Sequence, residues 1–347
     1  MRTVPGDLLC DILYLMILVI GDYYSGTGPA LVTKYYIDNL PKGTEYIRAR
    51  SKAARFVEMC VKIPRASVLF ISGHSRQNIW AMRIGKLLGR RSAYLMHGAV
   101  EYENEINRVP DRRMARDERE MMQRADQILA VSRQFEEWLK EKYPAWAGKI
   151  AHVTNGIDWQ IISEHSTADD RNSRGIISVG GGMPRKRILN ICRAVERLND
   201  RGYGITLTVA GDKGADSEQI DAFPFVRDIG LVSHDELMKE YHRNKLFIQN
   251  SVFETFGLAP IEALLSDADV LISGRCGALS VIKNTESMDI IEDPEDISEL
   301  ESKIETLLTA DNHTRLIVNL DKENTSWKKR SAELVRILER LRTQGRA

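Results

Sequence analysis

The sequence lacks the features that mark several large classes of protein. Its four cysteines, Cys10, Cys60, Cys192 and Cys276, form no Cys-x-x-Cys pair, and its seven histidines show no zinc-ligand spacing. Lys plus Arg and Asp plus Glu both total 49, so the net charge is zero. A balanced charge argues against a nucleic-acid-binding protein, and scattered cysteines are typical of reduced thiols in the cytoplasm.

A long hydrophobic run is also missing. The largely apolar stretch from Leu8 to Ile20 is interrupted by Asp11 and is too short to span a bilayer. It has neither the charged start nor the small-residue cleavage site of a signal peptide. We interpret residues 16–20 as a buried strand and residues 1–15 as an extension, with Met16 as an alternative start.

No complete Gly-x-Gly-x-x-Gly motif is present, which argues against a dinucleotide-dependent oxidoreductase. Gly26-Thr27-Gly28, after the first predicted strand, is only a partial match. Glycines there allow a phosphate to approach the backbone, and the simpler alternative is a plain turn.

Strand and helix signals alternate along the chain. In the first half we expect strands at 17–20, 67–71, 93–96 and 127–131, with helices at 30–40, 78–88 and 112–124. In the second half we expect strands at 176–179, 205–210, 246–248 and 270–273, with helices at 187–198, 235–241 and 327–341. The polar stretch 163–173 is typical of a linker. The sequence therefore predicts an α/β protein with two Rossmann-like, doubly wound parallel sheets facing across a cleft.

The stretch 253–265 carries the strongest chemical signal. It is typical of a strand end, a glycine turn and a helix start, with Glu254 before the turn and Glu262 in the helix. No Lys or Arg lies three or four positions from Glu262, so no local ion pair explains it. Amides near Gly257 and Leu258 would form an anion site, and carboxylates accept hydrogen bonds from hydroxyls. These features suit a nucleotide sugar, and the alternative is an amphipathic helix with two solvated glutamates.

Two further patterns carry weaker signals. Gly180-Gly181-Gly182 is followed by Arg185, Lys186 and Arg187 just before a helix, a run that is suited to clamping a diphosphate. A solvated basic helix start is the alternative, although cations there oppose the helix dipole. His97 ends a predicted strand, where α/β enzymes place ligand-facing side chains, and a structural role is its alternative.

As an ordered set, these pieces resemble the retaining GT-B glycosyltransferases of family 4. The resemblance rests on the Glu-x7-Glu frame of Glu254 and Glu262, and on the further motifs Asn155-Gly156-Ile157-Asp158, Ala125-Asp126 with Val131-Ser132, His97-Gly98, the 180–186 turn and Trp327. It covers residues 16–341. It implies an acceptor-side domain at 1–165, a nucleotide-sugar domain at 166–326, and a last helix, 327–347, that crosses back to the first domain.

The resemblance also implies roles for single residues. Lys186 would neutralise the leaving diphosphate in place of a metal, so we expect no metal and no cofactor, and Glu254 and His97 would contact the transferred sugar. These three are the expected catalytic residues. Glu262 would hold the ribose. The expected donor-binding residues are Gly26, Gly28, Gly181, Arg185, Leu231, Phe256, Gly257, Leu258 and Glu262.

Two departures from the family pattern leave an alternative open. Gly181 stands where the family usually has Arg, and Ser266-Asp267 and the run 276–280 replace family glycine motifs. The chain is thus expected either to transfer a sugar from a UDP-sugar to a saccharide or lipid-linked acceptor, in polysaccharide or glycoconjugate synthesis, or to be an inactive nucleotide-sugar-binding subunit. A homo-oligomer and a peripheral contact with the inner membrane face are both open. Arg48, Arg50, Lys52 and Arg55 give only scant support for that contact, and we interpret these charges as a solvated helix in preference to it.

Overall fold

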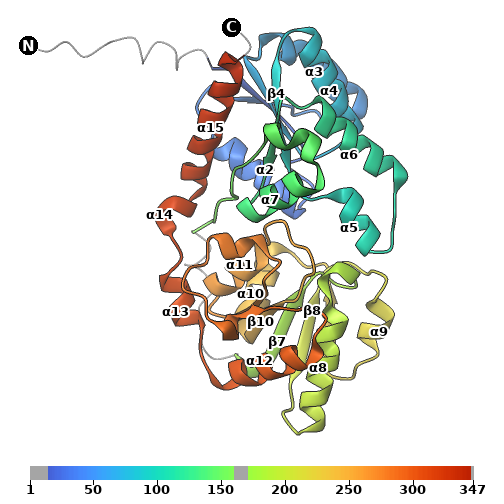
Figure 1. Ribbon diagram of the computed structural model, residues 1–347, viewed down its shortest axis with the longest axis vertical. Helices are drawn as coiled ribbons and strands as arrows, with labels where there is room; N and C mark the ends of the chain where they lie inside the picture. Colours follow the sequence, from blue (N-terminus) through green and yellow to red (C-terminus); the bar gives the residue numbers. More distant parts are fainter. Residues whose placement is uncertain (1–14, 160–170, 345–347) are drawn as a thin grey trace, which may run out of the picture. The chain divides into compact units, whose positions relative to one another are not determined.

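The computed structural model describes residues 15–159 and 171–344, which form two compact units. Unit 1 comprises Met1–Val100, Asp111–Gly156 and Ser326–Ala347, and unit 2 comprises Glu101–Pro110 and Ile157–Thr325. Each unit contains a six-stranded sheet flanked by helices (Figure 1). All neighbouring strands in both sheets run parallel, which confirms the predicted fold class.

The sheet of unit 1 has the strand order β2-β1-β3-β4-β5-β6. Its strands are β1 (Ile17–Ile20), β2 (Glu45–Tyr46), β3 (Val68–Ser72), β4 (Arg91–Met96), β5 (Gln127–Ala130) and β6 (Ile150–His152). The helices of this half of the chain are α2 (Gly28–Asn39), α3 (Lys52–Lys62), α4 (Arg76–Leu87), α5 (Val100–Ile106), α6 (Arg112–Arg124) and α7 (Arg133–Lys142). Every residue of β1 and β3 is buried, as expected for parallel strands covered on both faces.

Hydroxyl side chains set where several of these helices begin. Thr27 caps α2 by accepting a hydrogen bond from the Ala30 amide, and Pro29 occupies the first turn. The helix therefore starts at Gly28, two residues before the predicted position. Ser75 and Ser132 cap α4 and α7 in the same way.

The last helix, α15 (Trp327–Thr343), packs on unit 1 (Figure 1). Trp327 is 5% exposed; its ring stacks on Tyr35 at 4.8 Å between centroids and meets Tyr36 edge-on at 5.2 Å. A Cβ added at Gly156 would lie 2.5 Å from the Trp327 ring, so the chain passes too close for any larger residue. The C-terminal helix thus completes the core of the N-terminal unit.

The sheet of unit 2 has the strand order β12-β11-β10-β7-β8-β9. Its strands are β7 (Asn172–Val179), β8 (Thr206–Ala210), β9 (Val226–Gly230), β10 (Asn244–Gln249), β11 (Asp269–Ser273) and β12 (Ile290–Ile291). Its helices are α8 (Ile188–Asp200), α9 (Ser217–Asp221), α10 (His234–Arg243), α11 (Ala259–Leu265), α12 (Ile297–Thr309), α13 (His313–Val318) and α14 (Lys322–Thr325). Helices α8 and α12 lie side by side and bury Leu198, Leu300 and Ile304 against the sheet (Figure 1).

Some predicted boundaries were wrong or fall outside the described residues. Strand β7 begins at Asn172, so the last two residues of the predicted linker at 163–173 belong to a strand. The predicted domain boundary at 165/166 and nearly all of the 1–15 extension lie outside the described residues. Within the described ranges, no helix is both long enough and apolar enough to cross a membrane.

The chain order of the strands reverses at one point in each sheet. In unit 1 the reversal lies between β1 and β3, and in unit 2 it lies between β7 and β10. Doubly wound sheets bind ligands beside the carboxyl ends of the strands at such a switch point. The fold therefore predicts that ligand-binding residues follow β7 and β10 in unit 2, and β1 and β3 in unit 1.

Candidate functional site

The turn after β7 is built from three glycines that pack against the end of β8. The amides of Gly180 and Gly181 both donate to the Ala210 carbonyl, at 2.8 and 2.9 Å, and the Gly182 amide donates to the Asp212 carbonyl at 3.1 Å. Gly181 has a φ of +53°, and a Cβ there would lie 1.9 Å from the Asp212 oxygen. Close backbone contact thus accounts for these glycines, and their amides already have acceptors within the protein.

Four side chains converge at the switch point of unit 2, and we call them the Glu254 cluster. The side chain of Lys186 crosses Gly180, where an added Cβ would lie 2.5 Å from the Lys186 Cγ, and its Nζ donates to Glu254 Oε2. The same carboxylate oxygen accepts from Arg185 at 3.2 Å and from Gln249 Nε2 at 3.2 Å. The cluster therefore holds two cations around one carboxylate.

The charge state of the Glu254 cluster follows from its burial and its contacts. Burial raises the pKa of Glu254, but the charges of Lys186 and Arg185 outweigh burial and lower that pKa to about 2. Burial lowers the pKa of Lys186, with Glu254 acting in the opposite direction. The side chains of Arg185, Lys186 and Glu254 are only 11–14% exposed. Arg185 also pairs with Glu103 of α5 at 3.5 Å, so two carboxylates balance the two cations. Cations held in so little water attract an anion that replaces a carboxylate partner.

The predicted glycine turn and helix start lie next to this cluster. Gly257 has a φ of +82°, and a Cβ there would lie 2.9 Å from Cys276 Sγ, so only glycine fits. Helix α11 follows two residues later. In the described part of the chain, the amides of Phe256, Gly257 and Leu258 donate to no acceptor. Three adjacent unpaired donors form an anion-binding surface.

Glu262 has an ion-pair partner from another helix. Its side chain is 14% exposed, and Oε1 lies 3.3 Å from His234 Nε2, at the start of α10. The hydrogen bond to Glu262 raises the pKa of His234. The sequence showed no partner for Glu262 because the two residues are 28 positions apart. Leu231, the predicted neighbour of the base, is 72% exposed on the loop before α10.

In unit 1, His97 ends a chain of hydrogen bonds that begins at α2. Thr33 Oγ1 donates to the Pro29 carbonyl at 2.9 Å and lies 2.6 Å from Ser72 Oγ, which lies 2.8 Å from His97 Nε2. Each hydroxyl has a single proton, and that of Thr33 goes to Pro29. Ser72 must therefore donate to Thr33 and accept from His97.

This chain fixes the tautomer of His97. The Nε2–H donates to Ser72, so Nδ1 carries the lone pair of the neutral ring. Burial, together with the nearby His74, lowers the pKa of His97 to about 4, so the ring is neutral at pH 7. His97 is therefore a neutral ring held by this hydrogen-bond chain directly after β4.

The predicted glycine loop of unit 1 is open. Gly26 and Gly28 are both exposed, Gly26 has a φ of +77°, and a Cβ at either position would meet no atom within 4 Å. The sequence analysis missed Gly21, which follows β1 directly. A Cβ at Gly21 would lie 2.8 Å from the Ser72 carbonyl oxygen, so this glycine lets β1 and β3 end side by side.

Three polar residues of these networks were not predicted. Gln249 and Ser72 are the last residues of β10 and β3, and Thr33 lies on α2. Gln249 and Ser72 could have been found from their positions, because each lies at the carboxyl end of a strand beside the switch point. Thr33 gave no signal in the sequence, because its role depends on a contact 39 residues away.

The comparison with protein families assigns both halves of the chain. Residues 25–160 match the model described as Glycosyltransferase Family 4, and residues 162–323 match the model described as Glycosyl transferases group 1. The chain belongs to the family 4 glycosyltransferases. This result confirms the resemblance that the sequence motifs indicated.

Individual relatives of this glycosyltransferase are distant. The glycogen synthase of Mycobacterium tuberculosis is 22% identical over 197 residues, which span 54% of this chain and only 47% of that protein. The solved structure of Anabaena HepE in complex with UDP and glucose matches with a TM-score of 0.70 at 12% identity, covering 94% of this chain and 100% of that chain. Sucrose-phosphate synthase from Thermosynechococcus elongatus matches with a TM-score of 0.63 at 15% identity, covering 94% and 96%. These structural matches show that the glycosyltransferase has the GT-B fold.

The positions where this glycosyltransferase departs from the family motifs have specific structural roles. Asp267 has a φ of +66° just after α11, a conformation that glycine adopts without strain and that Asp tolerates better than most residues. Cys276 is buried, donates to the Phe256 carbonyl, and has a pKa raised to about 12 by burial. Cys276 is therefore a neutral thiol that supports the Gly257 turn.

Proposed function

We propose that this glycosyltransferase moves a hexose from a UDP-sugar to a saccharide or lipid-linked acceptor, with retention of anomeric configuration, in polysaccharide or glycoconjugate synthesis. The proposal rests on the two nearly buried cations of the Glu254 cluster, Arg185 and Lys186, beside the three unpaired amides at 256–258. That combination suits a diphosphate with a sugar attached. The HepE structure, which shares the fold, holds UDP and glucose.

In the proposed mechanism, a diphosphate competes with Glu254 for Lys186. When the donor binds, the Lys186 ammonium moves from the Glu254 carboxylate to the diphosphate and stabilises the charge that develops as the anomeric bond breaks. Glu254 is then free to accept hydrogen bonds from hydroxyls of the transferred sugar. Arg185 supplies the second cation, because no side chain fits at position 181. These protein cations take the place of a metal in the proposal.

The remaining predicted residues have supporting roles in the proposal. The neutral ring of His97 contacts the transferred sugar, with Ser72 and Thr33 holding the ring in place. Glu262 accepts from the ribose hydroxyls, which replace His234 as its partner. Gly26 and Gly28 leave the backbone of their loop accessible to the donor. Retention follows from attack on the same face from which the diphosphate leaves, a step that needs no second carboxylate.

Donor binding is tested by thermal shift with UDP, GDP and ADP and with their common sugar conjugates. We expect UDP-sugars to raise the Tm, because a ligand of the native state stabilises it by mass action. Lys186→Met should lower the transfer rate by about 100-fold or more, since it removes a cation that acts on the developing charge. Lys245→Met is the matched control: Lys245 is also nearly buried and paired, with Asp269, but lies outside the Glu254 cluster. Equal transfer rates in Lys186→Met and Lys245→Met would refute the mechanism.

The alternative function is a nucleotide-sugar-binding subunit without transfer activity. It is favoured by Gly181, where contact with Asp212 excludes the arginine that the family usually has. An assay for donor hydrolysis separates the two functions. Release of UDP at a rate that Lys186→Met abolishes supports the enzyme, whereas binding without any release supports the accessory subunit.

A further inference from the structure

One surface of unit 1 exposes large apolar side chains on two neighbouring helices. We call it the α3–α4 face. On α3 the exposed positions are spaced along one side of the helix, and α4 packs beside it. The exposed fractions are 45% for Phe56, 62% for Val57, 51% for Val61, 50% for Trp80, 87% for Leu87 and 45% for Leu88.

Helix α3 has an inverted pattern. Arg55 is only 6% exposed, while the neighbouring Phe56 and Val57 project into solvent. On the inner side Met59 is fully buried. A surface helix normally places its apolar residues inward and its charged residues outward. The outward apolar side of α3 therefore indicates a surface that binds another molecule.

The two helices present these side chains as one patch. The rings of Phe56 and Trp80 lie edge to face with 6.5 Å between centroids, and the Arg83 guanidinium lies 5.0 Å from the centre of the Trp80 ring. Cys60 is exposed on the same side of α3, one turn from Phe56 and Val57. A tryptophan flanked by aliphatic residues and cations is typical of a membrane–water interface.

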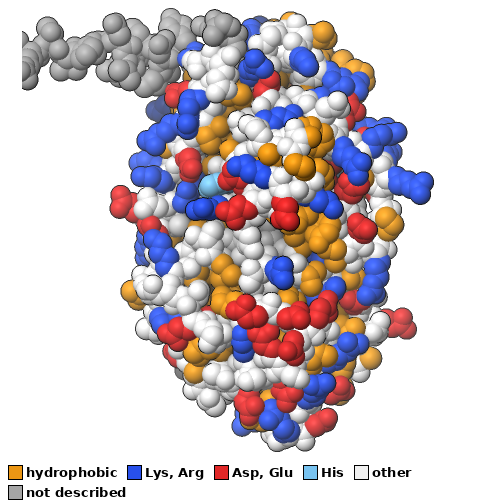
Figure 2. Space-filling model, viewed as in Figure 1, with side chains coloured by type: hydrophobic (Ala, Val, Ile, Leu, Met, Phe, Trp, Pro, Cys, Tyr) orange, Lys and Arg blue, Asp and Glu red, His pale blue; other side chains and the backbone are white. Residues whose placement is uncertain are grey.

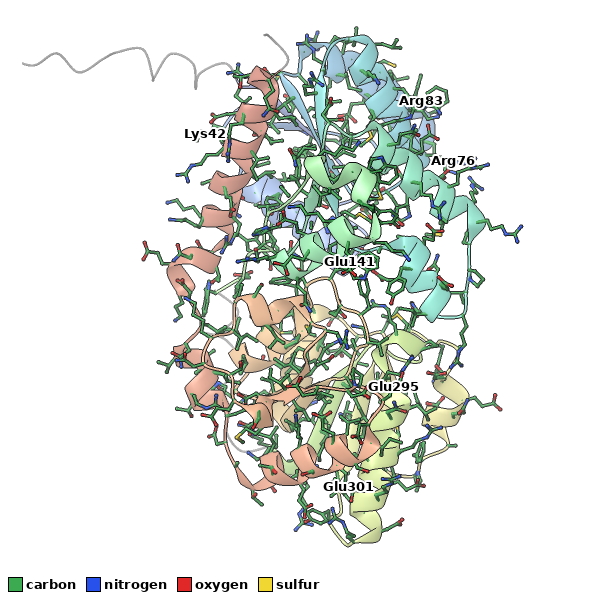
Figure 3. The ribbon with its side chains drawn as sticks, in the orientation of Figure 1. Lys42, Arg76, Arg83, Glu141, Glu295 and Glu301 are labelled. Carbon is green, nitrogen blue, oxygen red and sulfur yellow. The ribbon has the colours of Figure 1, made fainter. Side chains whose placement is uncertain are left out.

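The charge around the patch is strongly one-sided. Residues 52–91 contain nine Lys and Arg and one carboxylate, Glu58, although the whole chain has a net charge of zero. Asp117 and Glu120 of α6 pair with Arg76 and Arg83, the two cations labelled on α4 in Figure 3. Other cations have no ion-pair partner among the described residues, namely Lys52, Arg65, Lys86 and Arg90. Figure 2 shows Lys and Arg interspersed with hydrophobic side chains at this edge of unit 1.

These cations differ from the ones that the sequence suggested. Arg48 and Arg50 precede α3 and lie over the rings of Tyr46 and Tyr24, at 4.9 and 5.0 Å. Arg55 is buried. The predicted solvated helix was therefore wrong for three of the four residues, and only Lys52 belongs to the basic rim of the α3–α4 face.

We propose that the α3–α4 face docks on a lipid bilayer that contains anionic phospholipids. The apolar side chains would enter the interfacial region while the basic rim contacts the head groups. A second copy of the chain fits less well, because a two-fold contact would bring the same uncompensated cations against each other. Docking requires no nucleotide sugar, so it goes beyond the proposed function and its test is independent of transfer.

Vesicle binding tests this proposal directly. Purified full-length protein is sedimented with vesicles of phosphatidylcholine alone and of equal parts phosphatidylcholine and phosphatidylglycerol. We expect binding to the second only, weakened at 0.5 M salt because screening acts on exposed charges. A polarity-sensitive dye on Cys60, with Cys10 replaced by Ser, should show a blue shift on binding.

Two variants and two matched controls locate the contact. Phe56→Ser with Trp80→Ser should weaken binding at least about tenfold, because two large apolar side chains no longer enter the interface. Arg65→Glu with Lys86→Glu should weaken it more, since each cation contributes about fivefold. The controls are Val318→Ser, which removes an apolar side chain 77% exposed in unit 2, and Lys328→Glu with Lys329→Glu on the exposed side of α15.

Several outcomes would overturn the proposal. One is the absence of binding to anionic vesicles, and another is equal binding by the face variants and the controls. A third is a concentration-dependent dimer in analytical ultracentrifugation that Phe56→Ser with Trp80→Ser abolishes, because the face would then be a contact between copies. Thermal unfolding of each variant excludes loss of the fold as the cause.

Discussion

Replacing Glu254 with Gln should destabilise unit 2 more than replacing Lys186 with Met. Glu254→Gln leaves the nearly buried Lys186 without its carboxylate partner and leaves Arg185 with Glu103 alone, a change that costs about 3–5 kcal/mol. Lys186→Met leaves Glu254 bonded to Arg185 and Gln249, so the cost is about 1.5–3 kcal/mol, that of one lost hydrogen bond to a charged group. The double variant should cost about 2 kcal/mol less than the sum, because it removes both members of the pair.

The pH dependence gives a second measure of the same interaction. The pKa of Glu254 is about 2, below its ordinary value of 4.5. A lowered carboxylate pKa contributes stability above pH 4.5, about 3 kcal/mol here, and that contribution is lost as the pH falls toward 2. Glu254→Gln should lack this acid-dependent loss. Adding pyrophosphate at pH 7 should restore more stability to Glu254→Gln than to the natural protein, since the freed cations bind it.

Urea unfolding followed by circular dichroism measures these free energies. Because the two units need not unfold together, hydrogen exchange of peptides covering β7 and β10 assigns each change to unit 2. Equal losses in Glu254→Gln and Lys186→Met would show that Glu254 does not hold both cations. An unchanged acid-dependent loss in Glu254→Gln would also refute the reasoning.

Four further predictions follow from close contacts and from the hydrogen-bond chain. Gly181→Ala should abolish donor-induced thermal stabilisation and lower the Tm, because its Cβ meets a carbonyl at 1.9 Å. Ser72→Ala should lower kcat about tenfold with little change in the donor KM, because His97 loses the acceptor that fixes its tautomer; an unchanged kcat would exclude that positioning role. The pKa of His97 is about 4 in the folded protein and 6.5 in the unfolded chain, so the free energy of unfolding should decrease as the pH falls from 6.5 to 4. In acid titrations, His97→Gln should show a smaller decrease over this interval. Gly156→Ala should cost about 2 kcal/mol by urea unfolding, whereas Gly148→Ala, with no atom near the added Cβ, should cost little.

The sequence was most informative about regular, buried elements. The predicted helix at 112–124 coincides with α6, and the strands that end at 210 and 273 coincide at those ends with β8 and β11. Runs of buried β-branched and aliphatic residues signal a covered parallel sheet whatever their surroundings. The motif at 254–262 was placed correctly as a strand-end turn followed by a helix, because Gly257 and Pro260 act locally.

Contacts between distant residues could not be predicted in this way. Arg185 and Lys186 meet Glu254 only because β7 and β10 are neighbours in the sheet, although both lie more than 60 residues from Glu254 in the chain. The apolar side of helix α3 was missed because it faces outward, so the usual amphipathic pattern is reversed. The contacts of the glycines at 180–182 were also unpredictable: Lys186 fills the space at Gly180, the backbone of Asp212 that at Gly181, and Ser217 with Gly214 that at Gly182.

The position of α15 in the chain has a consequence for biosynthesis. Trp327 fills the core between Tyr36 and Gly156, yet it leaves the ribosome after the other segments of unit 1. Until α15 emerges, the first unit therefore has an uncovered aromatic pocket. A stop codon shortly before residue 327 should therefore damage the amino-terminal half of the enzyme more than the half in which it lies.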